Sequence, residues 1–568
     1  MSDSVEDARA PWEAWVAALL PVVLLLPFIN KAYHIDDTVY LLIAEQILAH
    51  PLDFYGFEMN WTGRSEWVYA FNQNPPGLSY YLAVVALIFG WSEPVMHVAM
   101  LLPASLAALG IYRLAECLCG RPLLATGIAV LTPGFLVSSS NVMCEPMMLA
   151  CYVWAMVYWV RGLDSGKKGH LFASVFLIGA GVMVKFIAVT VLPLLVAYTI
   201  VRERKTSLKL FWFFVPCLML AAYDLVAYIQ YEKSFIREII LYSTYHTSHA
   251  SHGTLMQSVI VPLSFAGGCY LSALLFLPFT KGRRLGLFVL GVFFVLATAM
   301  FVMGGFDDAY AMYNDDGIRL GFAFQVVLYA TGGIYLFILA FSDLWRERNA
   351  ESLTLLLLVG GIFIFSGFVN WVVNARSLLP MVPAVGILVV RRIDLSGGVR
   401  WGRVGLGVPL CVAGVLSLLV TLGDYRFAGT AREFAEQVDA EVSGVSGTVW
   451  YDGHLGFQYY MHEAGYAPMD FSEITGELGD PGYFEAVNVA LEPIEAGDVI
   501  LIWDQRRLTN KIPEERALES KVYQMSGAPW ISIFDDDTGA GFYGLPYASL
   551  PYCFGVTGPQ TYEMYKMK

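Results

Sequence analysis

The sequence predicts a mostly α-helical bundle that spans a membrane about thirteen times, followed by a C-terminal α/β domain. Of the 568 residues, 57% are hydrophobic and only 15% are charged, whereas a soluble protein carries about 25% charged residues. Apolar runs of roughly 18 to 22 residues, long enough to cross a bilayer, alternate with short charged loops. The net charge of −14 argues against nucleic acid as a partner. The composition therefore indicates an integral membrane protein.

The first apolar run extends from about Trp12 to Ile29 and is expected to remain as a membrane anchor. The segment before it, Met1 to Ala10, is polar and acidic, so it lacks the basic start of a signal peptide. Further apolar runs follow near residues 95–117, 123–140, 145–161, 170–185, 187–201, 208–228, 258–280, 285–303, 317–341, 353–369, 377–390 and 403–422.

Basic residues predict the orientation of these helices, because inside loops collect Lys and Arg. The segment from Pro76 to Trp91 is apolar but short, and counting it as a full span would place the later basic loops outside. We interpret it as a juxtamembrane or re-entrant helix on the outer side. The N-terminus is then inside, and the loop 30–94 and the region after Thr421 are outside. The predicted inside loops are Cys119 to Arg121, Arg161 to Lys168, Arg202 to Lys205, Lys281 to Arg284, Trp345 to Arg348 and Arg391 to Arg403.

The composition changes after Gly423, which predicts a boundary between a membrane domain, residues 1–422, and an extracytoplasmic domain, residues 423–568. The second part contains no run of membrane length. Thr448 to Tyr451 and Val499 to Trp503 are expected to be buried strands, and Leu455 to Ala464 a short helix. These elements predict a small α/β domain with its own core.

Two adjacent carboxylates follow the first apolar run in the motif Tyr33-His34-Ile35-Asp36-Asp37. Acidic side chains at the mouth of a membrane helix are costly to place near lipid, so they are candidates for function. An Asp at this position also makes a good helix cap, but a cap accounts for only one of the two carboxylates. We predict a catalytic role for Asp36 and Asp37, with His34 beside them as a substrate contact.

Two further charged residues lie at the same predicted depth. Glu145 opens a helix at the outer face, with Pro146 in its first turn, where an acid is often only a partner of the helix dipole. Lys185 is an isolated cation between two apolar runs, where it either snorkels to lipid phosphate or holds a substrate phosphate. We predict that Glu145 has a function at this face and that Lys185 binds substrate.

Arg376 ends a short outer loop that begins at Asn370. A guanidinium held in one position suits bidentate binding of a phosphate. A single Arg at the membrane interface is also commonly structural. We predict that Arg376 binds substrate.

Three histidines, His246, His249 and His252, recur at every third position of the outer loop Tyr242 to His252. On a helix they would share a face and could bind a metal. A loop rich in His and aromatic residues suits contact with headgroups or sugars equally well. We predict His246 and His249 as substrate contacts, and the sequence leaves open whether a divalent cation is required. The remaining acidic pairs of the outer loops are expected to be solvated: Asp307-Asp308 and Asp315-Asp316.

Several motifs taken together follow one known pattern: the acidic pair after the first helix, Asn74-Pro75-Pro76-Gly77-Leu78, Glu145-Pro146, Lys185 in a short turn, and Asn374-Ala375-Arg376-Ser377-Leu378-Leu379-Pro380. They resemble the GT-C glycosyltransferases related to dolichyl-phosphate-mannose protein mannosyltransferase and to the lipid A aminoarabinose transferase. The later stretches Trp450 to Tyr460 and Ala540 to Gly544 are similar to bacterial members.

The resemblance implies an inverting glycosyltransferase that uses a polyprenyl-phosphate sugar as donor and a lipid, glycan or protein as acceptor. It would work on the extracytoplasmic side of a bacterial cytoplasmic membrane. By position, Asp36 or Asp37 would be the catalytic base and Glu145 a second acid near the acceptor. Lys185 and Arg376 would bind the donor phosphate. Asn74 stands where the aminoarabinose enzymes have a Lys, and we keep it as a candidate substrate contact.

The residues themselves support the same chemistry, because carboxylates beside cations suit transfer of a group from a lipid phosphate. The alternative is a transporter or flippase of a lipid-linked glycan. That class is expected to contain repeated halves with interrupted helices near the midplane, and the sequence shows no internal repeat. A non-catalytic scaffold would leave the outer charges unexplained.

Overall fold

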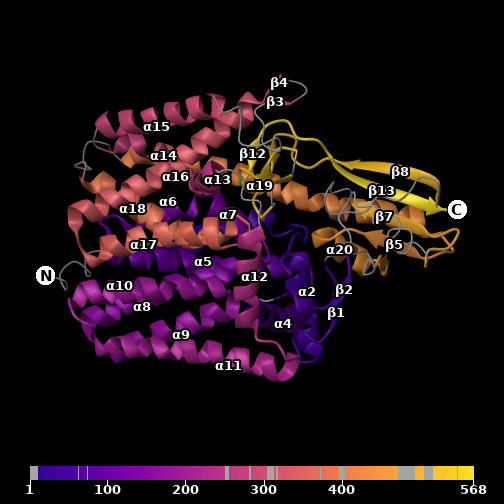
Figure 1. Cartoon of the computed structure of the whole chain (residues 1–568), viewed down its shortest axis with the longest axis horizontal. Coiled ribbons are helices and arrows are strands. Elements are labelled where there is room, and N and C mark those ends of the chain that lie inside the picture. Colours follow the sequence, from indigo (N-terminus) through magenta and orange to yellow (C-terminus); the bar gives the residue numbers. More distant parts are fainter. Residues whose placement is uncertain are drawn as a thin grey trace.

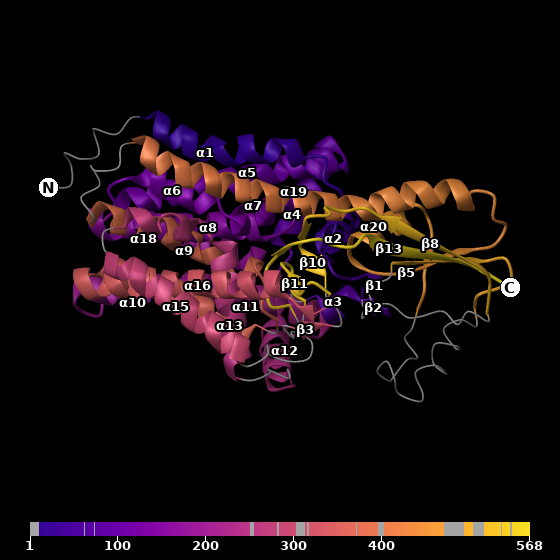
Figure 2. The ribbon, with the colours of Figure 1, turned by 90° about the horizontal axis from the view of Figure 1, so that it is seen from above.

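The computed structural model describes residues 11–568 except residues 62, 73, 250–254, 281–282, 303–312, 315–316, 371, 396–402, 471–492, 504–515, 536 and 546–547. Long helices form a bundle, and a smaller part built from strands and helices extends from the end opposite the start of α1 (Trp12–Leu25) (Figures 1 and 2). The predicted fold class, a mostly helical membrane bundle with C-terminal strands and helices, is confirmed.

The helices of the first half of the chain are α1 (Trp12–Leu25), α2 (Asp37–Ala49), α3 (Val68–Phe71), α4 (Gly77–Phe89), α5 (Glu93–Leu118), α6 (Pro122–Val130), α7 (Pro133–Ser139), α8 (Glu145–Ser165), α9 (Lys168–Val184), α10 (Val191–Glu203), α11 (Phe214–Tyr231) and α12 (Phe235–His249). Those of the second half are α13 (Leu255–Cys269), α14 (Ser272–Leu275), α15 (Arg283–Val302), α16 (Leu320–Glu347), α17 (Ala350–Ile364), α18 (Val382–Leu395), α19 (Arg403–Val442) and α20 (Leu455–Glu463).

Within the described residues, seven helices are long and apolar enough to cross a membrane, or eight if the bent pair α6 and α7 is one span. The predicted count of thirteen is therefore not confirmed. The predicted run 123–140 is split by a 68° bend, because Pro133 starts α7 and Thr132 caps it by accepting the N–H of Phe135 at 3.2 Å. Other predicted spans are apolar helices of shorter length, among them α9.

Helices α13 and α16 pack directly against each other in the bundle. A Cβ on Gly267 of α13 would lie 1.7 Å from the carbonyl oxygen of Tyr329, and one on Gly333 of α16 would lie 2.3 Å from that of Leu263. Glycine is therefore required at both positions for this close approach, as in other membrane helix pairs that use small residues at the contact.

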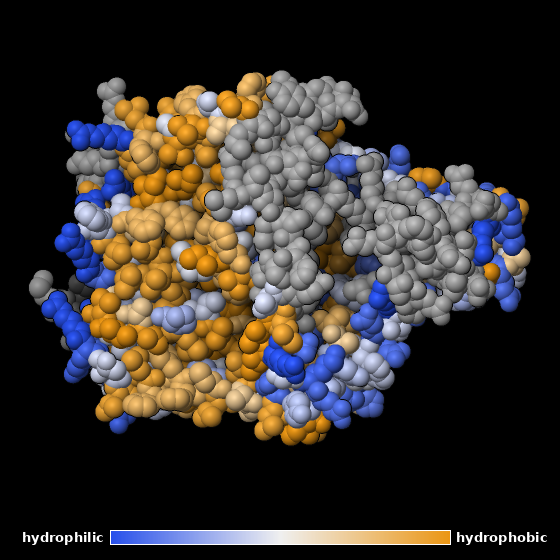
Figure 3. Space-filling model, viewed as in Figure 1, coloured by the Kyte–Doolittle hydropathy of each residue, from blue (hydrophilic) through white to orange (hydrophobic). Residues whose placement is uncertain are grey.

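In the part of the chain that the structure describes, charged residues in or next to the predicted inside loops meet at one end of the bundle. Ion pairs join them there: Arg121 to Asp394 at 3.2 Å, Arg202 to Asp164 at 2.9 Å, and Arg391 to Asp343 at 3.2 Å. Figure 3 shows hydrophilic residues at this end, on the left of the view, and a broad hydrophobic flank beside them. The C-terminal part extends from the opposite end (Figure 1). The bundle thus has the shape and surface of a membrane domain with two distinct ends.

Helix α19 connects the two parts and runs on to Val442, past the predicted boundary between residues 422 and 423 (Figure 2). The composition changes at that point but the backbone remains helical. The polar half of α19 covers the C-terminal sheet, where the ring of Phe434 stacks on that of Tyr562 at 4.6 Å. The division into two domains stays a prediction.

The C-terminal sheet has five strands in the order β6-β5-β7-β13-β8. Strand β5 (Val449–Asp452) is parallel to β6 (Ala467–Pro468) and β7 (Val499–Trp503), whereas β13 (Gln560–Met567) is antiparallel to β7 and β8 (Ala517–Met525). The predicted strands and helix appear as β5, β7 and α20. The short strand pairs elsewhere are β1 (Glu58–Asn60) with β2 (Ser65–Trp67), β3 (Tyr313–Asn314) with β4 (Gly317–Ile318), β9 (Ile531–Ser532) with β12 (Cys553–Phe554), and β10 (Phe534–Asp535) with β11 (Ala540–Gly541).

Candidate active site

Asp36 and Arg376 form an ion pair, and Arg376 also donates a hydrogen bond to the backbone carbonyl of Tyr543, so the pair lies at the end of the bundle that carries the C-terminal part. Asp36 occupies the position before α2, but its carboxylate makes no capping hydrogen bond to that helix. It faces the guanidinium of Arg376, which lies at the start of the turn Arg376–Met381 before α18. The Asp36 side chain is 31% exposed and that of Arg376 is 11% exposed, so the carboxylate is the accessible partner.

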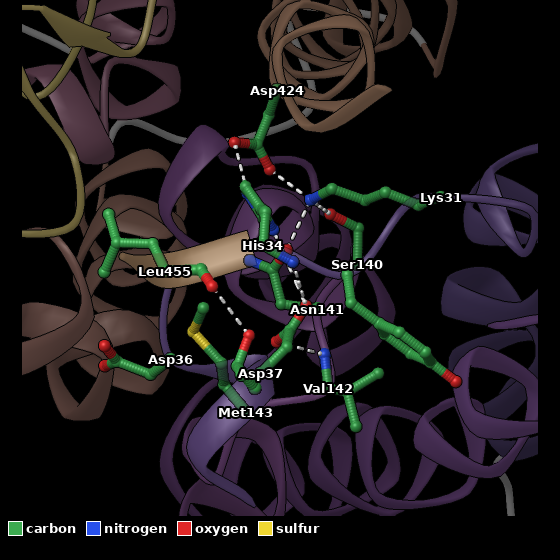
Figure 4. Close-up of polar contacts among 12 residues, drawn as sticks. Lys31, His34, Asp36, Asp37, Ser140, Asn141, Val142, Met143, Asp424 and Leu455 are labelled. Carbon is green, nitrogen blue, oxygen red and sulfur yellow. Dashed lines mark hydrogen bonds and ion pairs between the residues drawn. The ribbon is translucent and has the colours of Figure 1, made fainter. Parts of the chain in front are cut away.

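Asp37 is fully buried and has a different environment. Its carboxylate accepts the backbone N–H of Val142 at 3.0 Å and the backbone N–H of His34 at 3.1 Å (Figure 4). Both oxygens are therefore engaged, and the side chain ties the loop after α1 to the connection between α7 and α8. Of the predicted acidic pair, Asp36 faces the accessible site and Asp37 supports the loop.

Glu145 and Lys185 form a second ion pair next to the first. The Lys185 ammonium lies 2.6 Å from Oε1 of Glu145, and the Arg376 guanidinium lies 3.8 Å from the same oxygen. Glu145 is fully buried, while the Lys185 side chain is 19% exposed. The other carboxylate oxygen of Glu145 has no hydrogen-bond partner within the described part of the chain. Lys185 therefore pairs with protein in this structure and does not reach out as an isolated surface cation.

These four side chains carry two negative and two positive charges, so their cluster is balanced. Burial disfavours the charged form of Arg376, but the carboxylates of Asp36 and Glu145 outweigh this and raise its pKa. The guanidinium is therefore a permanent cation. Such a cluster can bind an anion at the cations and accept a proton at the exposed carboxylate.

A second charged cluster is buried next to the first, and the sequence analysis did not predict it. The buried ammonium of Lys31 contacts Asp424 of α19 and the side-chain oxygen of Asn141, and lies 3.3 Å from the Ser140 hydroxyl (Figure 4). Nε2 of His34 lies 3.2 Å from the other oxygen of Asp424. The signal present in the sequence is that Lys31 and Asp424 each lie two residues after the end of a predicted apolar run.

His34 is thus brought to the site, though as a buried partner of Asp37 and Asp424. Asn74 makes backbone hydrogen bonds, one of them from its N–H to Oδ1 of Asn72 at 3.3 Å. No hydrogen bond or ion pair of the described residues joins its side chain to the four charged groups.

The predicted histidine contacts, His246 and His249, lie at the end of α12, where the structure gives the helix but not these side chains. His252, Asp307, Asp308, Asp315 and Asp316 lie outside the described residues. In the part of the chain that the structure does describe, no group of three or more His, Cys, Asp or Glu side chains is placed to hold a metal.

Residues 73–229 match the family model of dolichyl-phosphate-mannose-protein mannosyltransferases. The match extends from α4 into α11 and includes Asn74, Glu145 and Lys185. It confirms the resemblance to these glycosyltransferases that the motifs indicate, and it supports a glycosyltransferase as the class of protein. No curated protein sequence matches the chain.

Several solved structures are similar to this chain. ArnT from Cupriavidus metallidurans bound to undecaprenyl phosphate is 14% identical, with a TM-score of 0.43, over 88% of this chain and 94% of that one. The oligosaccharyltransferase AglB from Archaeoglobus fulgidus in complex with an inhibitory peptide and a dolichol-phosphate is 12% identical, with a TM-score of 0.48, over 87% of this chain and 69% of that one.

Proposed function

We propose that the protein is an inverting glycosyltransferase that moves a sugar from a polyprenyl-phosphate donor to an extracytoplasmic acceptor. The observation that carries this proposal is the cluster of Asp36, Arg376, Glu145 and Lys185 at one end of the membrane bundle. The family match over residues 73–229 supports the reaction class.

Arg376 and Lys185 are the proposed ligands of the donor phosphate. A donor that approaches along the membrane presents its phosphate at the end of the bundle, and a guanidinium and an ammonium are the groups that bind it most strongly. Both cations are paired with carboxylates, so the phosphate competes with Asp36 for Arg376 and with Glu145 for Lys185. Binding of the donor then releases the Asp36 carboxylate for chemistry.

Asp36 is the proposed general base. The acceptor hydroxyl or amine attacks the anomeric carbon of the sugar, and its proton passes to the carboxylate of Asp36. The bond between the anomeric carbon and the phosphate oxygen breaks, and its electron pair stays on the phosphate. Arg376 and Lys185 stabilise the charge that develops there. Attack from the face opposite the phosphate inverts the configuration of the sugar. Asp37, with both oxygens occupied, holds the loop in position.

The C-terminal part is the proposed acceptor side of the site. It contacts the start of α2 directly, because Thr38 donates a hydrogen bond from its hydroxyl to the carbonyl of Leu455 at 2.9 Å. A Cβ on Gly456 would lie 2.3 Å from the carbonyl oxygen of Tyr33, so α20 begins in tight contact with the segment before Asp36. The acceptor is a lipid, a glycan or a protein, and the site faces the extracytoplasmic side of the membrane.

The test is reconstitution of the purified protein in vesicles with a panel of polyprenyl-phosphate sugars and extracts of cell-envelope acceptors. Consumption of one donor with formation of the free polyprenyl phosphate is the expected result. Transbilayer movement of a lipid-linked glycan without consumption of any donor would support the transporter instead.

A further inference from the structure

Tyr543, in the segment after β11, lies against the guanidinium of Arg376 and contacts it in two ways. Its backbone carbonyl accepts a hydrogen bond from Nη2 of Arg376 at 3.0 Å. Its ring lies under the same guanidinium, with 5.6 Å between Cζ and the ring centroid. The carbonyl fixes one edge of the planar group and the ring fixes one face, so Tyr543 restricts both the position and the tilt of Arg376.

The side chain of Tyr543 is itself fixed by hydrogen bonds to its hydroxyl group. Its hydroxyl donates to Oδ2 of Asp424 at 2.7 Å and accepts from the side-chain amide of Asn141 at 2.9 Å. Only 3% of Tyr543 is exposed. Asp424 is fully buried and is held in turn by Lys31 and His34, so its carboxylate cannot rotate away without losing several contacts.

The backbone around Tyr543 is matched to the loop that carries Arg376. The N–H of Ala375 donates to the carbonyl of Phe542 at 2.9 Å. Gly544 has a φ of +111°, and a Cβ there would lie 2.9 Å from the side chain of Val372. The segment 542–544 therefore follows the loop 372–376 closely on both sides of Tyr543.

We infer that Tyr543 and Asp424 are positioning residues for the donor-phosphate site, acting through Arg376. This inference rests on the proposed function. It adds two residues, both later in the chain than α18, to those on which the donor-phosphate site depends. The chain of contacts runs from Asp424 to the Tyr543 hydroxyl, and from the Tyr543 ring and carbonyl to Arg376. A guanidinium presents its donors in a fixed plane, so binding of a phosphate depends on the angle at which it is held.

The test compares Tyr543→Phe with the matched control Tyr552→Phe. Tyr552 is also fully buried and donates from its hydroxyl, to the carbonyl of Gly268 at 2.8 Å, within the bundle. Each variant is measured for its donor KM, its acceptor KM, and its affinity for a short-chain polyprenyl phosphate. We expect Tyr543→Phe to raise the donor KM and weaken phosphate binding about three- to tenfold. The variant loses the hydrogen bonds of the hydroxyl to Asp424 and Asn141 but keeps the ring and the carbonyl that contact Arg376, so only part of the free energy of these hydrogen bonds reaches the phosphate site. The acceptor KM should stay unchanged, and Tyr552→Phe should change neither donor value.

A double-mutant cycle separates this inference from the proposed function. The thermal unfolding temperatures of Tyr543→Phe, Arg376→Lys and the double variant are compared in detergent, where no donor is needed. Non-additive effects are expected for this pair, and additive effects for Tyr552→Phe with Arg376→Lys. Additive effects in the first cycle, or an unchanged phosphate affinity in Tyr543→Phe, would overturn the inference. A wild-type protein that binds no polyprenyl phosphate, together with a non-additive first cycle, would overturn the proposed function and leave the positioning of Arg376 supported.

Discussion

Asp36 and Arg376 are 340 residues apart in the chain and form an ion pair at the end of the membrane bundle. The same guanidinium lies 3.8 Å from Glu145, which is paired with Lys185. A base and a phosphate ligand that neutralise each other cannot both act until they separate. In the proposed reaction the arrival of the donor phosphate at Arg376 makes this separation favourable, so that proton acceptance is coupled to the presence of the donor.

The first prediction concerns Asp36→Asn, which should have opposite effects on turnover and on binding. Loss of the general base should lower the transfer rate about 10²- to 10⁴-fold. Loss of the carboxylate that competes for Arg376 should tighten the binding of polyprenyl phosphate, by about tenfold for one charge-assisted contact. Steady-state kinetics and direct titration of the purified protein with polyprenyl phosphate measure the two effects.

Two controls belong with Asp36→Asn. Asp164→Asn removes a similar Asp–Arg pair, with Arg202, at the opposite end of the bundle, and should leave both quantities unchanged. Asp37→Asn should lower the thermal stability, because the carboxylate of Asp37 holds two backbone N–H groups in a buried site. Transfer at the wild-type rate in Asp36→Asn would remove this residue from the mechanism.

The second prediction concerns the two cations. Arg376→Ala and Lys185→Ala should each raise the donor KM about ten- to a hundredfold, which corresponds to the loss of about 1.5 to 3 kcal/mol for a hydrogen bond to a charged group. The acceptor KM should change far less. Arg376→Lys should recover only part of the loss, because an ammonium cannot make two parallel hydrogen bonds.

Removal of Lys185 also leaves the buried carboxylate of Glu145 unpaired, which by itself destabilises the protein. The double variant Lys185→Met with Glu145→Gln separates the two effects, since it removes the ligand without leaving a buried charge. It should unfold near the wild-type temperature and still show the raised donor KM. A wild-type donor KM in this double variant would reduce Lys185 to a structural partner of Glu145.

The sequence predicted the class of the fold because that class depends on composition and run length. Apolar runs identify membrane helices whatever their packing, and in the described residues ion pairs join several of the predicted basic loops to each other. The charges that stand alone in apolar surroundings, such as Glu145 and Lys185, could also be identified, because their cost near lipid marks them. Their pairing with each other could not, since 40 residues separate them and either could have faced water.

The missed residues had their partners elsewhere in the chain. Asp424 lies within a helix whose composition simply becomes polar at that point, and only the fold shows that it meets Lys31, 393 residues earlier. Tyr543 was part of a motif in the sequence. Its contacts to Arg376 and Asp424, however, are made by its backbone carbonyl and its hydroxyl, and the directions of these groups depend on tertiary structure. Asp36 and Asp37 are adjacent at the start of α2 and therefore point in different directions, and which of them faces Arg376 depends on how α2 packs in the fold.

The third prediction concerns the buried pair of Lys31 and Asp424. Lys31→Met should destabilise the protein by about 3 to 5 kcal/mol, because it leaves the buried carboxylate of Asp424 without its main counter-charge. The double variant Lys31→Met with Asp424→Asn removes both charges and should recover much of this loss. Thermal unfolding in detergent measures both. An equal loss of stability in the single and the double variant would contradict a compensated charge pair.

The fourth prediction concerns the sidedness of the molecule. The predicted inside loops share one end of the bundle, and the C-terminal part extends from the other, so a label should reach the two ends from opposite sides. The eight native cysteines are free and would first be replaced. Single cysteines would then be introduced at two exposed positions, Ser446→Cys before β5 and Lys167→Cys between α8 and α9.

In intact cells or right-side-out vesicles, a membrane-impermeant maleimide should label Ser446→Cys directly and label Lys167→Cys only after permeabilisation. The physical reason is that Lys and Arg are retained on the inner side during insertion, so the end of the bundle that carries Arg202 stays on that side. Because Asp36 pairs with Arg376 and Arg376 contacts Tyr543 of the C-terminal part, one labelling pattern decides the side on which the donor phosphate must be presented. Direct labelling of Lys167→Cys, together with protection of Ser446→Cys, would reverse the predicted orientation in the membrane and place the whole site on the cytoplasmic side.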